Sequence, residues 1–364
     1  MKKILFVATV DIHIINHHLR VIHKLKEEGN QIDLASFGDY TNEDITNKYN
    51  VSFSKNPLSL GNIKAYFFMK KLLKENEYDI ISCHTPLSSF FTRLAAKNTK
   101  AKVIYTAHGL HFFKGCPFIN RTIYKTMEKW AAKYTDTFVT INEEDYEAIK
   151  EFKLKDGGKR VLIPGVGIDL NKINNIKNKN ISKSNFGFED DSYLMISIGE
   201  VNRNKNQKYV IDSLKNELKE DPKLHYVICG KDLMDKWLNN YVELIGLANK
   251  VHFLGYREDV LDILSVSDLF ICPSYREGLP VSVMEAMALG KDIIVTNCRG
   301  NRDLIKNDIN GKVVELDKEQ QLLKAYHDIR DNKEKSEAFK KQNEQLIKQY
   351  SADIIDAQIL DLYK

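Results

Sequence analysis

The chain alternates short apolar runs with segments in which apolar residues recur at helical spacing. In the segment 17–28, Leu19, Ile22 and Leu25 fall on one helical face, and Gly29 ends the pattern. Six apolar runs in the first half are expected to be buried strands: 4–10, 31–36, 78–83, 102–106, 138–141 and 160–163. Strands that alternate with helices predict a parallel, doubly wound α/β sheet.

The alternation stops once and then starts again. Residues 171–192 are polar and rich in Asn and Lys, which predicts a linker or surface loop. A second series follows, with strands expected at 193–198, 224–229, 251–254, 269–272 and 292–296 and helices at 207–218, 234–247, 260–266 and 282–288. A charged helical stretch begins near residue 319. Because 364 residues exceed what one core usually organises, we expect two Rossmann-like domains facing each other across a cleft.

The composition indicates the compartment in which the protein works. The longest apolar run near the start, 4–10, is too short to cross a bilayer and no cleavage site follows it, so we expect no signal peptide. The five cysteines are scattered without a C-x-x-C pair, which favours a reducing, cytoplasmic compartment and predicts neither a zinc site nor disulfides.

Residues 1–165 hold 25 Lys and Arg against 18 Asp and Glu, whereas the remainder is slightly acidic. This basic half suits an anionic partner such as a membrane surface, or equally a solvated Lys-rich face. Nucleic acid is not expected, because no basic recognition helix accompanies the charge.

The segment 269–290 carries the clearest chemistry. A strand runs into a loop punctuated by Gly278 and Pro280, and a helix is expected to begin near Ser282. Ser282 as N-cap would put Glu285 at the third helical position, where a capping box needs it. Alternatively, Glu277 and Glu285 accept hydrogen bonds from sugar hydroxyls while the helix N-terminus faces an anion. Both roles are open for Glu285 at this point.

The same segment resembles a known family. Glu277 followed by Glu285-Ala286-Met287-Ala288-Leu289-Gly290 is similar to the E-x(7)-E signature of glycosyltransferase family 4, whose fold is GT-B. Three further segments resemble that family's motifs: Ser197-Ile198-Gly199 with Lys205, Val227-Ile228-Cys229-Gly230, and Val251-His252-Phe253-Leu254-Gly255. Ile163–Asp169 is similar to its crossover between domains.

The resemblance implies a division of labour along the chain. Residues 1–170 are expected to bind the acceptor and residues 171–345 the nucleotide-sugar, with 346–364 a helix that packs back toward the first domain. It implies ribose contacts for Glu285, sugar and phosphate contacts for Glu277, and neutralisation of the diphosphate by Lys205. The other implied donor-binding residues are Gly199, Gly230, Leu254, Gly278, Leu279 and Pro280. The family's Arg after the turn glycine is Glu200 here, so Arg203 is a candidate replacement cation.

His108 is the candidate catalytic residue of the first half. It lies at the end of a predicted strand, in the run Thr106-Ala107-His108-Gly109. This run resembles the family's T-x-H-G motif, whose histidine the family places near the transferred sugar. Strand ends of this kind concentrate function in doubly wound folds. His13, His17, His18 and His111 carry no comparable argument. The family's glycine-rich first turn is absent from residues 10–16.

The stretch 110–133 interleaves aromatic and basic residues, among them Phe112, Phe113, Lys114, Phe118, Arg121, Tyr124, Lys125, Lys129, Trp130 and Lys133. Lys125, Lys129 and Lys133 are four apart, on one helical face. Such a face suits anionic lipid headgroups, and an ordinary amphipathic helix explains it as well. We therefore expect a cytoplasmic protein that can associate with the inner face of the cell membrane.

Together these features predict a retaining glycosyltransferase that moves a hexose or N-acetylhexosamine from a UDP-sugar to a lipid-linked saccharide during polysaccharide assembly. We expect no cofactor and no metal, because Lys205 and helix amides take the place of a metal at the diphosphate. Two alternatives stay open: a nucleotide-sugar epimerase, and a non-catalytic nucleotide-binding partner, which Glu200 favours. A dehydrogenase is disfavoured, since no G-x-G-x-x-G follows the first strand.

Overall fold

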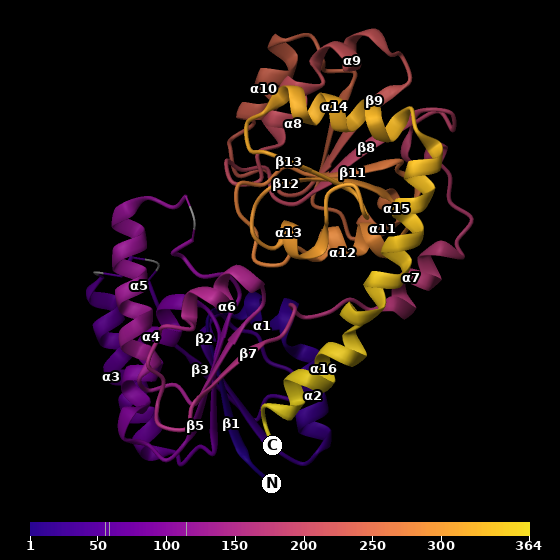
Figure 1. Cartoon of the computed structure of the whole chain (residues 1–364). Coiled ribbons are helices and arrows are strands. Elements are labelled where there is room, and N and C mark those ends of the chain that lie inside the picture. Colours follow the sequence, from indigo (N-terminus) through magenta and orange to yellow (C-terminus); the bar gives the residue numbers. More distant parts are fainter. Residues whose placement is uncertain (55, 58, 114) are drawn as a thin grey trace. The chain divides into compact units, whose positions relative to one another are not determined.

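The computed structural model describes the chain except Lys55, Leu58, Lys114 and the side chain of Asn120. It comprises two compact units (Figure 1). The first unit contains Met1–Val166 and Asp353–Lys364, and the second contains Gly167–Ala352. The chain thus passes between the units twice, whereas the sequence placed the divisions at residues 170 and 345.

A parallel sheet forms the centre of the first unit. Its described strands lie in the order β3-β2-β1-β4-β5-β6-β7. Their bounds are β1 Lys3–Val10, β2 Gln31–Phe37, β3 Asn47–Asn50, β4 Ile80–Cys83, β5 Lys102–Ala107, β6 Thr137–Thr140 and β7 Lys159–Leu162. Because β1 has β2 on one side and β4 on the other, the strand order reverses at β1. That reversal is the point at which open α/β sheets bind ligands.

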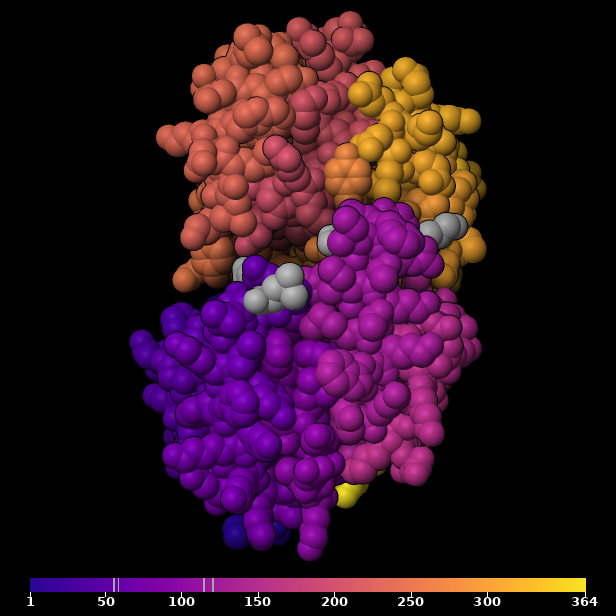
Figure 2. All heavy atoms as spheres, turned by 90° about the vertical axis from the view of Figure 1, so that its left-hand side faces the viewer, coloured from indigo at the N-terminus to yellow at the C-terminus, as the bar shows by residue number. Residues whose placement is uncertain are grey.

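Helices cover both faces of this sheet. The helical segments of the unit are α1 Asp11–His17, α2 Leu19–Glu27, α3 Leu60–Glu75, α4 Pro86–Ala95, η1 Ala96–Asn98, α5 Phe118–Ala132, α6 Glu143–Ile149 and α16 Ala352–Asp361. Residues of α3, α4 and α5 share one apolar core with the sheet, and residues of α1, α2 and α16 share another. The face that carries α3 and α5 is turned toward the viewer in Figure 2.

The second unit repeats the plan with a second parallel sheet, whose described strands lie in the order β10-β9-β8-β11-β12-β13. Its strands are β8 Tyr193–Ile198, β9 Leu224–Cys229, β10 Val251–Gly255, β11 Leu269–Cys272, β12 Asp292–Thr296 and β13 Lys312–Val314. Its helical segments are α7 Leu170–Lys177, η2 Lys183–Phe186, α8 Gln207–Ser213, α9 Lys215–Glu220, α10 Trp237–Leu244, α11 Val260–Val266, α12 Val281–Ala288, α13 Asn301–Leu304, α14 Glu319–Arg330, α15 Lys333–Leu346 and η3 Ile347–Tyr350. Here the strand order reverses at β8, between β9 and β11.

The structure corrects the prediction of a loop at 171–192. Residues 170–177 form α7, which begins where Asp169 Oδ1 accepts hydrogen bonds from the backbone of Asn171 and Lys172. Ile173 and Ile176 are buried on one face of this helix. Two apolar residues three apart, with a cap, suffice for a short packed helix in an otherwise polar stretch.

Among the described residues, no helix is both long and apolar enough to cross a membrane.

Candidate functional site

Two glycines bring the loops after β8 and β9 into close contact. A Cβ atom at Gly230 would lie 1.9 Å from the carbonyl oxygen of Gly199, and a Cβ at Gly199 would lie 2.9 Å from Cε of Lys205. Gly199 also has a φ of +143°, a conformation that favours glycine. Three residues predicted to bind the donor are therefore packed together at the carboxyl edge of the sheet.

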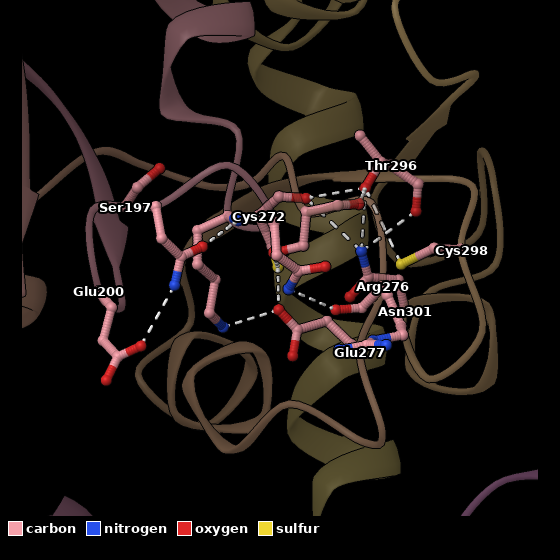
Figure 3. Close-up of polar contacts among 12 residues, drawn as sticks. Ser197, Glu200, Cys272, Arg276, Glu277, Thr296, Cys298 and Asn301 are labelled. Atoms are coloured by element: carbon pink, nitrogen blue, oxygen red, sulfur yellow. Dashed lines mark hydrogen bonds and ion pairs between the residues drawn. The ribbon is translucent and has the colours of Figure 1, made fainter. Parts of the chain in front are cut away.

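Lys205 forms an ion pair with Glu277, and Figure 3 shows the surroundings of Glu277. The distance from Lys205 Nζ to Glu277 Oε1 is 2.7 Å, and the two side chains are 24% and 12% exposed. Burial opposes the charge of Lys205, but the Glu277 carboxylate outweighs it and raises the pKa of Lys205. The Lys205 amide donates to Oδ1 of Asn202 at 2.9 Å. A cation is thus fixed at the end of β8.

The backbone around Glu277 is held by the loops on both sides. On the β8 side, the Tyr275 amide donates to the carbonyl of Asn204 at 2.8 Å, and Asn204 Nδ2 donates to the carbonyl of Arg276 at 3.0 Å. On the β12 side, Nε of the buried Arg299 donates to the carbonyl of Glu277 at 3.2 Å. A carboxylate in a loop would otherwise be mobile, so these bonds preorganise it.

The sequence did not single out Arg299 or Asn204. Arg299 follows β12, and the adjacent Gly300 approaches the turn so closely that a Cβ there would lie 2.4 Å from the carbonyl oxygen of Gly278. A basic residue next to a glycine at the carboxyl end of a predicted strand was the available signal.

Glu200 and Arg203 both lie on the surface of this unit. The Glu200 carboxylate is exposed and accepts a hydrogen bond from Asn202 Nδ2 at 3.1 Å, and Figure 3 places it away from Glu277. Arg203 is exposed and lines a groove together with Trp237 and Tyr275. The structure therefore groups Lys205 with Glu277, and places Arg203 in the groove beside them.

The predicted capping box at Ser282 and Glu285 is wrong. Helix α12 begins at Val281 with Pro280 as N-cap, so Glu285 lies in the second turn, beyond the reach of a capping box. The helix therefore starts two residues earlier than a Ser282 N-cap would place it. Burial raises the pKa of Glu285 to about 7, with the positive charge of Lys172 acting in the opposite direction.

The start of α12 has the character of an anion site. Gly278, the buried Leu279 and Pro280 form the turn from Glu277 into the helix, and the N-cap residue Pro280 makes no side-chain cap hydrogen bond. Amides and the helix dipole at such a start favour negative charge. Leu254, predicted to frame the base, is half-buried in the edge strand β10, and its role stays a prediction.

His108 lies in the first unit, directly after β5, among other histidines. Its Nε2 is 3.1 Å from Nε2 of His18, and its ring is edge-on to that of His13 at 4.6 Å. Burial lowers the pKa of His108 well below its usual range and that of His13 to about 3. The predicted catalytic histidine is thus one member of a cluster of neutral rings, which sequence reasoning missed.

The comparisons with known proteins establish the family. Residues 178–346 match the family described as glycosyl transferases group 1, and residues 3–142 match the family described as glycosyl transferase 4-like. A protein of Bacillus subtilis named as a glycosyltransferase, EpsD, is 34% identical over 86% of this chain and 84% of its own length. The chain therefore belongs to the glycosyltransferases, as the resemblance predicted, and this assignment disfavours an epimerase.

Two further relatives have more specific names. A protein of Escherichia coli named UDP-Gal:α-D-GlcNAc-diphosphoundecaprenol α-1,3-galactosyltransferase is 30% identical over 81% of this chain and 77% of its own length. A protein of Campylobacter jejuni named N,N'-diacetylbacillosaminyl-diphospho-undecaprenol α-1,3-N-acetylgalactosaminyltransferase is 29% identical over 83% of this chain and 81% of its own length.

Solved structures confirm the predicted fold class. The Anabaena protein HepE, in complex with UDP and glucose, superposes with a TM-score of 0.79 at 17% identity, covering 100% of this chain and 99% of that one. Sucrose-phosphate synthase of Thermosynechococcus elongatus gives a TM-score of 0.82 at 16% identity, covering 100% and 98%. Two Rossmann-like units of the GT-B class are thus present.

Proposed function

We propose that this glycosyltransferase moves a sugar from a UDP-sugar to a lipid-linked saccharide in polysaccharide assembly, with retention at the anomeric carbon. The observation that carries the proposal is the Lys205–Glu277 pair beside the start of α12. The names of the E. coli and C. jejuni relatives both include an undecaprenol-linked acceptor and an α-linked product. An α-linked product supports retention when the donor is itself α-linked.

In the proposed reaction the second unit holds the donor. Lys205 Nζ has three donors, so it can keep Glu277 and also bind a diphosphate oxygen. Glu277 orients the transferred sugar, and Glu285 accepts the ribose hydroxyls. The acceptor hydroxyl attacks the anomeric carbon as the bond to the diphosphate breaks, and a phosphate oxygen takes the acceptor proton. Lys205 and the α12 amides stabilise the charge on the leaving group, the role that a metal has in other transferases.

The direct test is release of UDP from UDP-sugars by the purified protein with a lipid-linked acceptor. We expect Lys205→Ala to lower turnover by roughly 100-fold or more, the usual cost of removing one group that stabilises transition-state charge. Lys208→Ala is the matched control, because Lys208 is only three residues away yet pairs with Asp212. Equal activity of both variants would contradict the assignment of Lys205.

Metal independence and the role of Arg203 have separate tests. Donor binding that persists in EDTA supports Lys205 as the cation. Binding that is lost in EDTA and restored by Mg²⁺, an ion that prefers oxygen ligands, rejects metal independence at the donor site. Arg203→Ala should weaken donor binding only if its groove holds part of the diphosphate. Unchanged donor affinity in this variant, beside a weakened Lys205→Ala, removes Arg203 from the site.

The non-catalytic alternative has one specific observation in its favour, which is Glu200 at the family's arginine position. Because its carboxylate is exposed and bonded to Asn202, it need not face a bound diphosphate. Donor binding without UDP release, across a panel of lipid-linked acceptors, would favour the alternative. Release of UDP only with acceptor present would exclude it.

We also propose that the face of the first unit formed by α3 and α5 meets anionic lipid (Figure 2). Large apolar side chains are exposed on both helices, among them Phe67 at 60%, Phe118 at 80% and Trp130 at 51%. Lys129 and Lys133 are exposed beside them, whereas Lys125 is paired with Glu151 at 2.6 Å. Apolar side chains flanked by lysines are typical of interfacial surfaces. Lys114, also part of the predicted stretch, lies outside the described residues.

Flotation with vesicles tests this surface. A variant with Phe118→Ser, Trp130→Ser, Lys129→Ala and Lys133→Ala should lose binding to anionic vesicles, and Lys215→Ala with Lys219→Ala on α9 should keep it. Equal flotation of both variants would remove the membrane proposal without affecting the donor site.

A further inference from the structure

Four histidines from separate segments converge at the carboxyl edge of the first unit's sheet. His13 lies in α1, His18 between α1 and α2, His84 directly after β4, and His108 directly after β5. Strands β1, β4 and β5 are neighbours in the sheet, so their carboxyl ends bring these segments together at the reversal of strand order. His18 and His84 are buried, and His13 and His108 are half-buried.

The ring nitrogens have the spacing of a metal site. One nitrogen of each histidine lies within 4.8 Å of one nitrogen of each of the others. Nε2 of His18 and Nε2 of His108 are 3.1 Å apart. Tetrahedral zinc with Zn–N distances of about 2.0–2.1 Å separates its nitrogens by roughly 3.3–3.4 Å. Nitrogens near the 4.8 Å limit would therefore move about 1.5 Å closer together to share one ion.

Two of these rings have nitrogen atoms without a hydrogen-bond partner among the described residues. They are Nε2 of His13 and Nδ1 of His84, and both atoms are buried. Buried polar nitrogen is costly to leave unpaired. His84 is only 1% exposed, so water cannot freely satisfy it. A metal ion would use both lone pairs.

The other nitrogen of His84 is held as metal ligands usually are. Its Nε2 is 3.0 Å from Oγ of Ser82, and that oxygen is 2.6 Å from the hydroxyl of Tyr363. Histidine ligands almost always donate their second N–H to such a partner, which fixes the tautomer and turns the free nitrogen toward the ion. The chain Tyr363–Ser82–His84 thus presents Nδ1 as the ligand atom.

We propose that His13, His18, His84 and His108 bind one divalent transition-metal ion, of the class of zinc. Imidazole nitrogen suits zinc, nickel, copper and cobalt, whereas magnesium and calcium prefer oxygen ligands, which this set lacks. Four protein nitrogens complete a tetrahedral site, so the ion is structural and joins the segments after β1, β4 and β5.

This ion is separate from the proposed donor chemistry. It differs from the sequence-based expectation that the protein holds no metal, and it leaves the proposed roles of Lys205 and the α12 amides in the second unit unchanged. The bound ion would also occupy Nε2 of His108, so this nitrogen could not contact the transferred sugar.

The test uses the full-length protein without a histidine tag, stripped with EDTA and titrated with Co²⁺ and then Zn²⁺. We expect one equivalent of Co²⁺ with the visible absorption of a tetrahedral site, displacement by Zn²⁺, and a higher thermal midpoint with Zn²⁺. His13→Ala should bind at least about tenfold more weakly, and Ser82→Ala about 10- to 100-fold more weakly, as loss of a ligand's supporting partner does.

The matched control is His225→Ala in the second unit. Nδ1 of His225 is 3.1 Å from Nε2 of His252, so this variant removes a close histidine pair outside the proposed site. It should bind Co²⁺ like the unmodified protein. Absence of saturable binding by the unmodified protein, or equal affinity in all variants, would overturn the proposal. If His13→Ala fails to fold in EDTA, the milder Ser82→Ala decides. Stabilisation by UDP, measured on the same samples, reports separately on the donor site.

Discussion

Lys205 and Glu277 are each other's counter-charge as well as candidate ligands of the donor, so a change at either residue has two effects. Both side chains are largely buried, and a partly buried charge without its partner is destabilising. Loss of activity in a single variant therefore mixes lost chemistry with a disturbed loop. A pair of variants separates the two effects.

The first prediction concerns the free energy of unfolding of this pair. Glu277→Gln and Lys205→Met should each destabilise the second unit by about 1–3 kcal/mol, and the double variant should lose less than the sum. Urea unfolding, followed on the transition that UDP shifts, measures the coupling. Strict additivity would mean that the pair contributes nothing to stability.

The second prediction concerns pH and Glu285. Its pKa of about 7 in the folded unit lies above the usual value of 4.5, so the protonated form is favoured in the unliganded protein. The folded state then binds more protons than the unfolded one, and stability should fall as pH rises from about 4.5 to about 7. Ribose hydroxyls prefer the carboxylate as acceptor, so UDP-sugar affinity should rise through about pH 7.

Isothermal titration with a UDP-sugar over this range measures the affinity, because the sugar-linked diphosphate has no ionisation of its own near neutral pH. Glu285→Gln should bind with an affinity that is independent of pH. A pH dependence retained in this variant would assign the titration to another group.

At the scale of elements, the close contact between the ends of β8 and β9 gives a third prediction. Gly230→Ala would place a methyl group 1.9 Å from the Gly199 carbonyl oxygen, so the turn after β8 must move. We expect a loss of about 1–3 kcal/mol, as for other overpacked sites, together with weaker UDP binding. Thermal unfolding with and without UDP measures both.

Gly61→Ala is the control for that substitution. Gly61 lies in α3, and its nearest listed neighbour, Ser59 Oγ, would be 3.4 Å from the new Cβ. Alanine there should be neutral or stabilise the protein by up to about 1 kcal/mol. Equal effects at Gly61 and Gly230 would show that the close contact does not govern the turn.

Most strands were predictable because they are buried and apolar. The bounds of β8, β9, β11 and β12 agree with the sequence pattern residue for residue. The two strands that the pattern missed are β3, with the polar sequence Asn47–Asn50, and the short β13. Both lie at sheet edges. β3 is polar and not buried, so it depends on backbone pairing to one neighbour, whereas β13 is mostly buried but only three residues long, too short to give a clear apolar run.

The sequence named the candidate site residues one by one but could not give their arrangement. The family motifs located Lys205 and Glu277 at strand ends, yet their ion pair joins positions 72 residues apart. The histidines were missed for the same reason. Each is isolated in its own segment, and only the neighbourhood of β1, β4 and β5 makes them a cluster.

At the scale of the whole molecule, the last residues of the chain belong to the first unit. In α16, Ile355 is fully buried in the apolar core shared with α2, and Tyr363 after it is 4% exposed. Asp356 pairs with Arg20 at 3.2 Å and with Lys24 at 3.1 Å. Figure 1 shows α16 beside α2.

The fourth prediction follows from this packing. Ile355→Ala should destabilise the first unit by about 2–5 kcal/mol, the usual cost of truncating a buried isoleucine. Its neighbour Ile354 is 45% exposed, so Ile354→Ala should change stability by no more than about 0.5 kcal/mol. Calorimetry with and without UDP assigns each transition to a unit. A shift of the UDP-sensitive transition alone by Ile355→Ala would contradict the assignment of α16 to the first unit.

The two passages of the chain between the units also set an order of events during synthesis. Residues 1–166 leave the ribosome first, but they lack Ile355 and Tyr363 until residues 353–364 have followed. The second unit, Gly167–Ala352, is continuous and has all its strands before that point. Domains usually fold in the order in which they are made. In this chain, by contrast, we expect the first unit to stay partly folded until residues 353–364 have been made, after the second unit is complete.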